Sequence, residues 1–204
     1  MSTKPIASQV VPGENGAESA TANQGAIRPR DSWFHWCGTA DAISQTSKRA
    51  ERRALLEAYF SAAAAETVTP AARYFSGAFL APAEQATSRI DRTVIIAAVQ
   101  ELARFDPADF EERYPDDRDL SEAAAEVFAG RLPSGLSVRD VSIWGEELAS
   151  ASEAERQRGL VREMLARLGA IEAKYLVKLI GGSAPGIDES EIEEAVAKRR
   201  PRGA

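Results

Sequence analysis

A single cysteine and a single histidine occur among the 204 residues, as Cys37 and His35. One cysteine cannot form an internal disulfide framework, so we expect a protein of a reducing, intracellular compartment. A multi-ligand zinc site needs about four nitrogen or sulfur ligands, which this pair cannot supply. The chain also lacks a run of 18 apolar residues and an apolar stretch at its start. It therefore predicts neither a membrane-spanning helix nor a secretory signal peptide.

An excess of positive charge is also absent, because the net charge is −6. Residues 106–122 hold eight acidic and two basic residues, so this stretch alone accounts for the whole net charge. By contrast, residues 48–53 hold four basic residues and one acidic residue, and residues 198–202 hold four basic residues. A chain whose charges are segregated in this way can bind a polyanion on one side despite its negative total.

Alternation of apolar and polar residues, which is typical of half-buried strands, is scarce, whereas apolar residues recur every three or four positions. We therefore predict an all-α, multi-helix domain over residues 31–200. Residues 131–135 interrupt the helical pattern and divide the domain into two helical halves, about 32–130 and 136–200. Residues 1–30 are rich in small and polar residues without any period, which predicts a disordered N-terminal tail.

Short polar signals predict where helices begin. Ser32 stands before the first apolar cluster, and Asp106, Asp119 and Asp188 stand before later helices as N-cap candidates. Two further signals predict a helix that starts at Thr69-Pro70, with proline in its first position, and a capping box that opens a helix within residues 150–158.

Two candidate sites are better explained by packing and solvation. His35 and Cys37 lie two positions apart, so on a helix they point in different directions and cannot form a nucleophile and base pair. We expect both to pack the first helix. Residues 106–122 lack the fixed spacing and the central glycine of a calcium loop. This acidic stretch is therefore expected to form a solvated face that keeps DNA away from its side.

The glycine-rich residues 181–186 superficially offer a phosphate cradle. They lack the Gly-Lys-Ser/Thr ending of a nucleotide-binding P-loop. The acidic residues that follow, Asp188, Glu189 and Glu191, stabilise the dipole of the next helix and compete with a phosphate. A helix stop followed by a capped restart is the simpler interpretation.

The basic residues at positions 48–53 are the first feature for which a binding function competes with a plain solvated surface. Four cations within six residues, preceded by the hydroxyls of Thr46 and Ser47, suit the phosphates of a nucleic-acid backbone. Arg156 and Arg158, near the start of a later helix, form a second place of this kind, where the solvated-surface interpretation is at least as good.

Five motifs, in order along residues 33–198, resemble those of one family. They are residues 172–182 with Gly186, Ile187 and residues 191–196; residues 46–49 with Leu55-Leu56 and Tyr59-Phe60; residues 70–77; residues 114–124; and residues 150–158. Residues 172–182 resemble the Glu-Ala-Lys-Tyr/Phe-Leu-x-Arg/Lys-Leu-Leu-x-Gly segment of the helical N-terminal DNA-binding domain of ATP-dependent DNA ligases. The resemblance rests on the five motifs together and on their order along the chain.

The resemblance implies a domain that grips duplex or nicked DNA across the minor groove through the backbone, in DNA repair, replication or recombination. The residues that it implies as DNA contacts are Thr46, Lys48, Arg49, Arg52, Ser152, Arg156, Gly182 and Ser183. It also implies a cytoplasmic, nucleoid-associated protein. Residues 183–186 replace the Leu-Arg-Ile-Gly of the family, so one DNA-contacting arginine is missing.

Full-length ligases of this family use ATP and Mg²⁺, with a lysine nucleophile in a Lys-x-Asp-Gly motif. None of the five lysines of this sequence stands in such a motif, so we expect neither cofactor, catalytic residue nor metal site in this chain. The sequence leaves three interpretations open: a DNA-binding module, a degenerate protein-interaction module that pairs with a separate ligase catalytic domain, and an N-terminal fragment of a full ligase.

Overall fold

The computed structural model describes residues 29–81, 90–103, 106–115, 119–183 and 186–199. Within these ranges the chain is helical and has no β-strand, apart from one isolated bridge between Ser32 and Ser137. The all-α prediction is therefore confirmed. No helix in these ranges is long and apolar enough to cross a bilayer. Of the predicted disordered tail, residues 1–30, the first 28 lie outside the described residues. The other two, residues 29 and 30, belong to a 3₁₀ turn.

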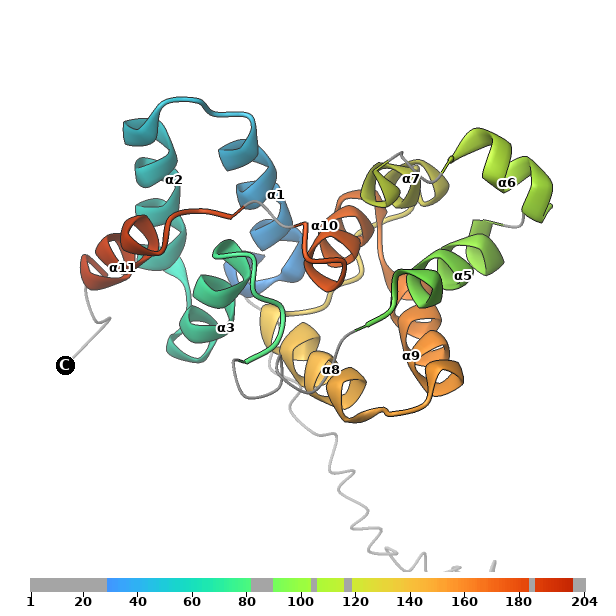
Figure 1. Ribbon diagram of the computed structural model, residues 1–204. Coiled ribbons are helices and arrows are strands. Elements are labelled where there is room, and N and C mark those ends of the chain that lie inside the picture. Colours follow the sequence, from blue (N-terminus) through green and yellow to red (C-terminus); the bar gives the residue numbers. More distant parts are fainter. Residues whose placement is uncertain (1–28, 82–89, 104–105, 116–118, 184–185, 200–204) are drawn as a thin grey trace, which may run out of the picture.

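Figure 1 shows the order of the elements along the chain. They are η1 (Pro29–Asp31), α1 (Trp33–Ser44), α2 (Arg49–Ala62), α3 (Ala65–Phe75), α5 (Arg92–Ala103), α6 (Pro107–Arg113), α7 (Leu120–Val127), α8 (Val138–Ser150), α9 (Ala154–Arg167), α10 (Ala170–Ile180) and α11 (Glu189–Ala197).

The predicted caps are confirmed at four helix starts. The Ser32 hydroxyl accepts a hydrogen bond from the His35 backbone N–H, which begins α1. The carboxylates of Asp106, Asp119 and Asp188 each accept one from the backbone N–H two positions later, and so begin α6, α7 and α11. Each cap satisfies an N–H group that the helix itself leaves unpaired.

The predicted helix start at Thr69-Pro70 is wrong, because α3 begins at Ala65 and Pro70 lies inside it. A proline within a helix removes the hydrogen bond to the carbonyl four residues earlier, here that of Glu66. Since Glu66 lies in the first turn, the break affects only the beginning of the helix.

The capping box predicted within residues 150–158 is also wrong. The Ser150 hydroxyl donates to the backbone carbonyl of Glu147 at 2.7 Å, and α9 begins after Glu153, whose side chain makes no cap hydrogen bond. A capping box instead begins α8, where Ser137 and Asp140 exchange side-chain and backbone hydrogen bonds.

The helices that precede and follow residues 131–135 are interleaved in space. Helix α10 packs mainly against α7 and α1, α9 packs against α5, and α11 packs against α2. Figure 1 shows α2, α3 and α11 at one end of the molecule and α5, α6, α7 and α9 at the other, with α1, α8 and α10 between them. One continuous hydrophobic cluster joins both ends, so the predicted halves, 32–130 and 136–200, are consecutive in sequence but share a core.

Helix α1 supplies the centre of this core. The rings of Trp33 and Trp36 stack with their centroids 4.8 Å apart, and both are fully buried with Cys37. The His35 ring lies at the edge of the helix and stacks on Tyr59. Burial raises the pKa of the Cys37 thiol well above its usual value, which keeps the thiol protonated and unreactive. The predicted packing role of the His35-Trp36-Cys37 triplet is confirmed.

Candidate nucleic-acid interface

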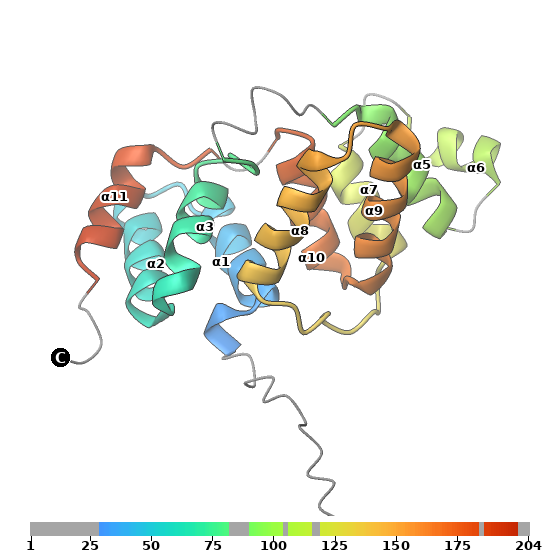
Figure 2. The ribbon, with the colours of Figure 1, turned by 90° about the horizontal axis from the view of Figure 1, so that it is seen from below.

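The predicted contact residues lie in three segments. Thr46, Lys48, Arg49 and Arg52 belong to the α1–α2 turn and the start of α2, Ser152 and Arg156 to the α8–α9 turn and the start of α9, and Gly182 and Ser183 to the segment after α10. Figure 2 shows the α8–α9 turn and the segment between α10 and α11 along the same, upper edge of the molecule.

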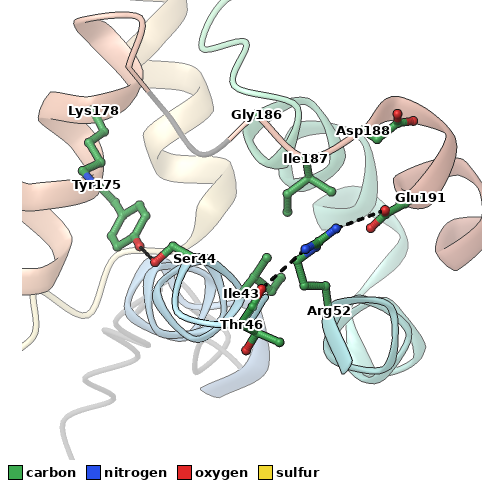
Figure 3. A pocket seen from close by; sticks show the side chains of 10 residues that line it. All are labelled: Ile43, Ser44, Thr46, Arg52, Tyr175, Lys178, Gly186, Ile187, Asp188 and Glu191. Carbon is green, nitrogen blue, oxygen red and sulfur yellow. Dashed lines mark hydrogen bonds and ion pairs between the residues drawn. The ribbon is translucent and has the colours of Figure 1, made fainter. Parts of the chain in front are cut away.

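A cavity of about 520 Å³ opens beside two of these segments (Figure 3). It is lined by Ile43, Ser44, Thr46, Arg52, Tyr175, Lys178, Gly186, Ile187, Asp188 and Glu191. Tyr175 and Lys178 of α10 lie on one side, with Ser44 of α1 below them, and Arg52 and Glu191 lie on the other. Four helices and the α1–α2 turn therefore bring two cations, two carboxylates and three hydroxyl groups to one opening.

The α10 side of the cavity is held by side chains that reach α1 and α7. The Tyr175 hydroxyl donates to a carboxylate oxygen of Asp41 at 3.2 Å. The Lys178 ammonium lies 3.9 Å from the Asp119 carboxylate and 5.8 Å from the centre of the Tyr175 ring. At 3.9 Å this ion pair is long, and the ammonium lines the cavity, where an anion could approach it.

The α2 side is dominated by a carboxylate of α11. One oxygen of Glu191 lies 2.9 Å from the Arg49 guanidinium and 3.4 Å from that of Arg52. The residue is 4% exposed, and its other carboxylate oxygen has no hydrogen-bond partner among the described residues. Glu191 therefore occupies the position beside Arg49 and Arg52 where a phosphate would neutralise them.

The remaining polar groups of the α1–α2 turn are partly engaged. The Thr46 hydroxyl donates to the Ala42 carbonyl at 2.8 Å, and Arg52 donates to the Ser47 carbonyl at 3.1 Å. The Lys48 ammonium pairs with Glu51 at 2.8 Å, but the Lys48 side chain is 75% exposed. Exposed pairs of this kind contribute at most about 1 kcal/mol, so a phosphate can displace the carboxylate.

The α8–α9 turn borders a second cavity of about 350 Å³, which shares no lining residue with the first. Ser152 and Arg156 line it together with Glu147 and Glu153. The Arg156 guanidinium lies 2.7 Å from the Glu147 carboxylate. Four of the eight predicted site residues are thus divided between two openings, and in each of them an arginine is paired with a carboxylate. The other four, Lys48, Arg49, Gly182 and Ser183, line neither opening.

The segment after α10 stops the helix as predicted. Gly182 has a φ of +70°, a conformation that favours glycine, and the Ser183 backbone N–H donates to the Lys178 carbonyl at 2.8 Å. Both residues are exposed. Residues 184 and 185 lie outside the described part of the chain.

The acidic stretch 106–122 lies in and around α6 and α7. Asp106, Asp109 and Glu112 are exposed, and Figure 1 shows α6 at the end of the molecule opposite α2 and α11. Residues 116–118 of this stretch are outside the described residues. Among those that the structure describes, no group of three His, Cys, Asp or Glu side chains could hold a metal ion.

Glu191, Lys178, Tyr175 and Ser44 were not predicted as site residues. The sequence indicated only that Glu191 would stand in the first turn of the last helix, where its charge opposes a phosphate. Nothing in the local pattern indicated that α11 packs against α2, which brings Glu191 to Arg49.

Comparisons with known proteins agree on one family. A family model described as the DNA ligase N terminus matches residues 33–197. A protein named "Probable DNA ligase" from Koribacter versatilis (strain Ellin345) is 32% identical over 163 residues, which cover 78% of this chain and 28% of that protein. Another "Probable DNA ligase", from Opitutus terrae (strain DSM 11246 / JCM 15787 / PB90-1), is 27% identical over 203 residues, with 82% of this chain and 20% of that protein covered. This chain thus spans between a fifth and just over a quarter of these relatives.

Proposed function

Because this chain belongs to the family of the DNA ligase N terminus, as its motifs predicted, we propose that it binds duplex or nicked DNA. Binding uses the phosphates of the backbone and has no sequence preference. The role belongs to DNA repair, replication or recombination, in the cytoplasm and in association with the nucleoid.

The cavity between α10 and α2 is the observation that carries this proposal. Arg52 and Lys178 supply cations there. The hydroxyls of Ser44 and Thr46 also line the cavity, and each would have to turn from the backbone carbonyl to which it now donates in order to contact a phosphate. Lys48 and Arg49 extend the cationic surface along the first turn of α2, where both side chains are exposed. The acidic α6 at the opposite end repels a polyanion from that end, while the glutamates of α11 beside α2 limit the attraction at this one.

Fluorescence anisotropy with a labelled nicked duplex tests the proposal. Affinity should fall as the salt concentration rises. The slope of log affinity against log salt concentration should be about −0.9 for each phosphate that is contacted. The double substitution Lys48→Glu with Arg49→Glu should weaken binding at least tenfold and make the slope shallower, without a change in helicity by circular dichroism.

A matched control reverses two exposed arginines at the other end of the molecule, Arg113→Glu with Arg162→Glu. This control changes the net charge by the same amount and should weaken binding far less. Absence of binding at low salt, or an affinity that is indifferent to salt, would contradict the proposal.

The ion pairs between α2 and α11 favour a second candidate, in which this domain acts mainly as a protein-interaction module for a separate ligase catalytic domain. Glu191 already neutralises Arg49 and Arg52, which weakens their attraction for phosphate. ATP and Mg²⁺ would then be used by that catalytic domain and not by this chain. The same division would hold if this chain is the N-terminal part of a full ligase. Nick sealing that this chain stimulates on mixing with a catalytic domain supports this candidate, and an unchanged rate of sealing contradicts it.

A further inference from the structure

Four arginines gather on the edge of the molecule that lies opposite the α8–α9 turn. Residues 131–137 run along this edge, which is the lower edge in Figure 2, between η1 and the α9–α10 turn. At one end of this segment, Ser137 forms a bridge with Ser32. At the other end, Arg131 donates to the Ala166 backbone carbonyl at 3.3 Å.

These contacts place two arginines at each end of the segment. Arg30 and Arg139 lie within two residues of the Ser32–Ser137 bridge. Arg131 lies beside Ala166, which directly precedes Arg167. All four side chains belong to exposed residues, and so does Leu132. We call these five residues, Arg30, Arg131, Leu132, Arg139 and Arg167, the arginine patch.

The arginine patch differs from the α2 surface, which consists of Lys48, Arg49 and Arg52, in whether its cations have carboxylate partners. Lys48, Arg49 and Arg52 each have a carboxylate within 4.0 Å. None of the four arginines of the patch has one within that distance among the described residues. Two carboxylates near the patch are engaged elsewhere: Asp140 caps α8, and Glu172 is buried beneath the segment, where it accepts hydrogen bonds from Ser134 and Gly169. Glu163, which is exposed and stands four residues before Arg167 on α9, does not come within 4.0 Å of that guanidinium. The four arginines of the patch therefore have no close carboxylate partner among the described residues.

Leu132 indicates which anion the patch suits. Its side chain is 85% exposed, the most exposed of the large apolar residues described, and it stands next to Arg131. The Arg131 guanidinium lies 4.4 Å from the centre of the Phe128 ring, so its plane is held in place. Arginines with an apolar anchor are typical of protein interfaces, where a guanidinium binds a carboxylate through two hydrogen bonds. A phosphodiester backbone offers no apolar pocket for a leucine.

We propose that the arginine patch is the docking surface for an extended, acidic segment of a protein partner, which carries carboxylates toward both of its ends and an apolar contact for Leu132. Seven residues, 132–138, stand between Arg131 and Arg139, and an extended chain spans at most about 3.5 Å per residue. A partner segment of six to eight residues is thus long enough to reach both pairs. This proposal does not depend on DNA binding by the α2 surface.

The test uses the full chain and a fluorescein-labelled twelve-residue peptide of glutamate and aspartate around a central Leu-Leu. Its control is the same peptide with glutamine and asparagine in place of the acids. By anisotropy, the acidic peptide should bind at least tenfold more tightly than its control. Arg131→Glu with Arg167→Glu should weaken binding of the acidic peptide at least tenfold, and Leu132→Ser about threefold or more.

Lys48→Glu with Arg49→Glu is the matched variant on the α2 surface, and it should leave peptide affinity within twofold. The milder pair Arg131→Gln with Arg167→Gln, checked for unchanged helicity, replaces the charge reversal if that variant does not fold. Equal binding of both peptides, or unchanged affinity of the patch variants, overturns the proposal. It is also overturned if Leu132→Ser has no effect while reversal at the patch abolishes binding of duplex DNA, because the patch would then be a nucleic-acid surface.

Discussion

At the scale of the residue, Glu191 matters more than any cation around it. Its carboxylate forms ion pairs with both Arg49 and Arg52, and the residue is buried from water. If the α2 surface binds DNA, a phosphate must compete with Glu191 for both arginines. A removal of negative charge from this buried position therefore has an effect opposite in sign to that of most substitutions at a binding site.

We predict that Glu191→Gln increases affinity for nicked DNA. A partly exposed ion pair contributes up to about 1 kcal/mol, so freeing its cations should tighten binding roughly fivefold. The slope of log affinity against log salt should become steeper by about 0.9 for each phosphate gained. Anisotropy at several salt concentrations measures both quantities. Glu189→Gln, an exposed change in the same helical turn, is the control, and equal behaviour of the two variants would contradict the role of Arg49 and Arg52.

A second prediction concerns His35 and pH. Burial, and then the charge of Arg30, lower the pKa of His35 in the folded protein, while Asp31 opposes the shift. The unfolded chain therefore binds the proton at a higher pH, and the free energy of unfolding should fall as pH drops below about 6.5. His35→Phe keeps a ring on Tyr59 and should remove this part of the pH dependence.

Urea denaturation between pH 5 and pH 8 measures the effect. Because His35 is the only histidine, the difference between the two proteins isolates its titration from that of the carboxylates. Equal pH slopes in both proteins would show that the folded and unfolded forms bind this proton equally well.

At the scale of the element, α10 is fixed by a carboxylate of its first turn that accepts hydrogen bonds from two earlier parts of the chain. Glu172 is fully buried and accepts hydrogen bonds from the Ser134 backbone N–H and hydroxyl, at 2.8 and 2.7 Å, and from the Gly169 N–H at 2.9 Å. The residue thus joins the start of α10 to residues 131–137. The arginine patch depends on this attachment, because the same segment carries Arg131 and Leu132.

Glu172→Ala should lower the free energy of unfolding by about 3–5 kcal/mol, since it leaves buried N–H donors unpaired as well as removing the hydrogen bonds. Urea denaturation followed by circular dichroism measures this loss. Glu153→Ala, at the start of α9, is the comparison, because its side chain makes no cap hydrogen bond. The comparison variant should change stability by no more than about 0.5 kcal/mol. A loss of the same size in both variants would contradict the anchoring role.

The beginnings of helices could be predicted where a single side chain decides them. Ser32 and Asp188 cap their helices through hydrogen bonds within three residues, which a sequence pattern contains in full. Pro70 misled the prediction because its fixed φ suits any position in the first turns of a helix, and packing of the preceding residues extended α3 toward Ala65. At the site, Arg52 and Glu191 lie 139 residues apart, so only the tertiary packing of α11 could bring them together.

At the scale of the whole molecule, one core connects helices from both parts of the sequence. Trp33 and Trp36 are buried within it, and it extends without a break to Leu165 of α9 and Leu176 of α10. Because the core is shared, neither part can unfold without exposing apolar side chains of the other. The charges are less simply arranged: acidic α6 lies at one end, and at the other the arginines of α2 are paired with glutamates of α11.

We therefore predict a single cooperative unfolding transition in urea. Tryptophan fluorescence, which reports mainly on the surroundings of α1, and far-ultraviolet circular dichroism, which reports on all helices, should give coincident curves. Two separate transitions, or midpoints that differ between the two probes, would indicate that residues 32–130 and 136–200 unfold independently.

The packing of α11 on α2 also constrains how the protein is made. Ribosomes add about 5–20 residues per second, so α2 leaves the exit tunnel roughly 7–28 s before its partner helix follows. Throughout that interval α2 can pack on α1, but the side that later contacts α11 has no cover, and Arg49 and Arg52 lack the carboxylate of Glu191. Completion of this part of the fold must await α11.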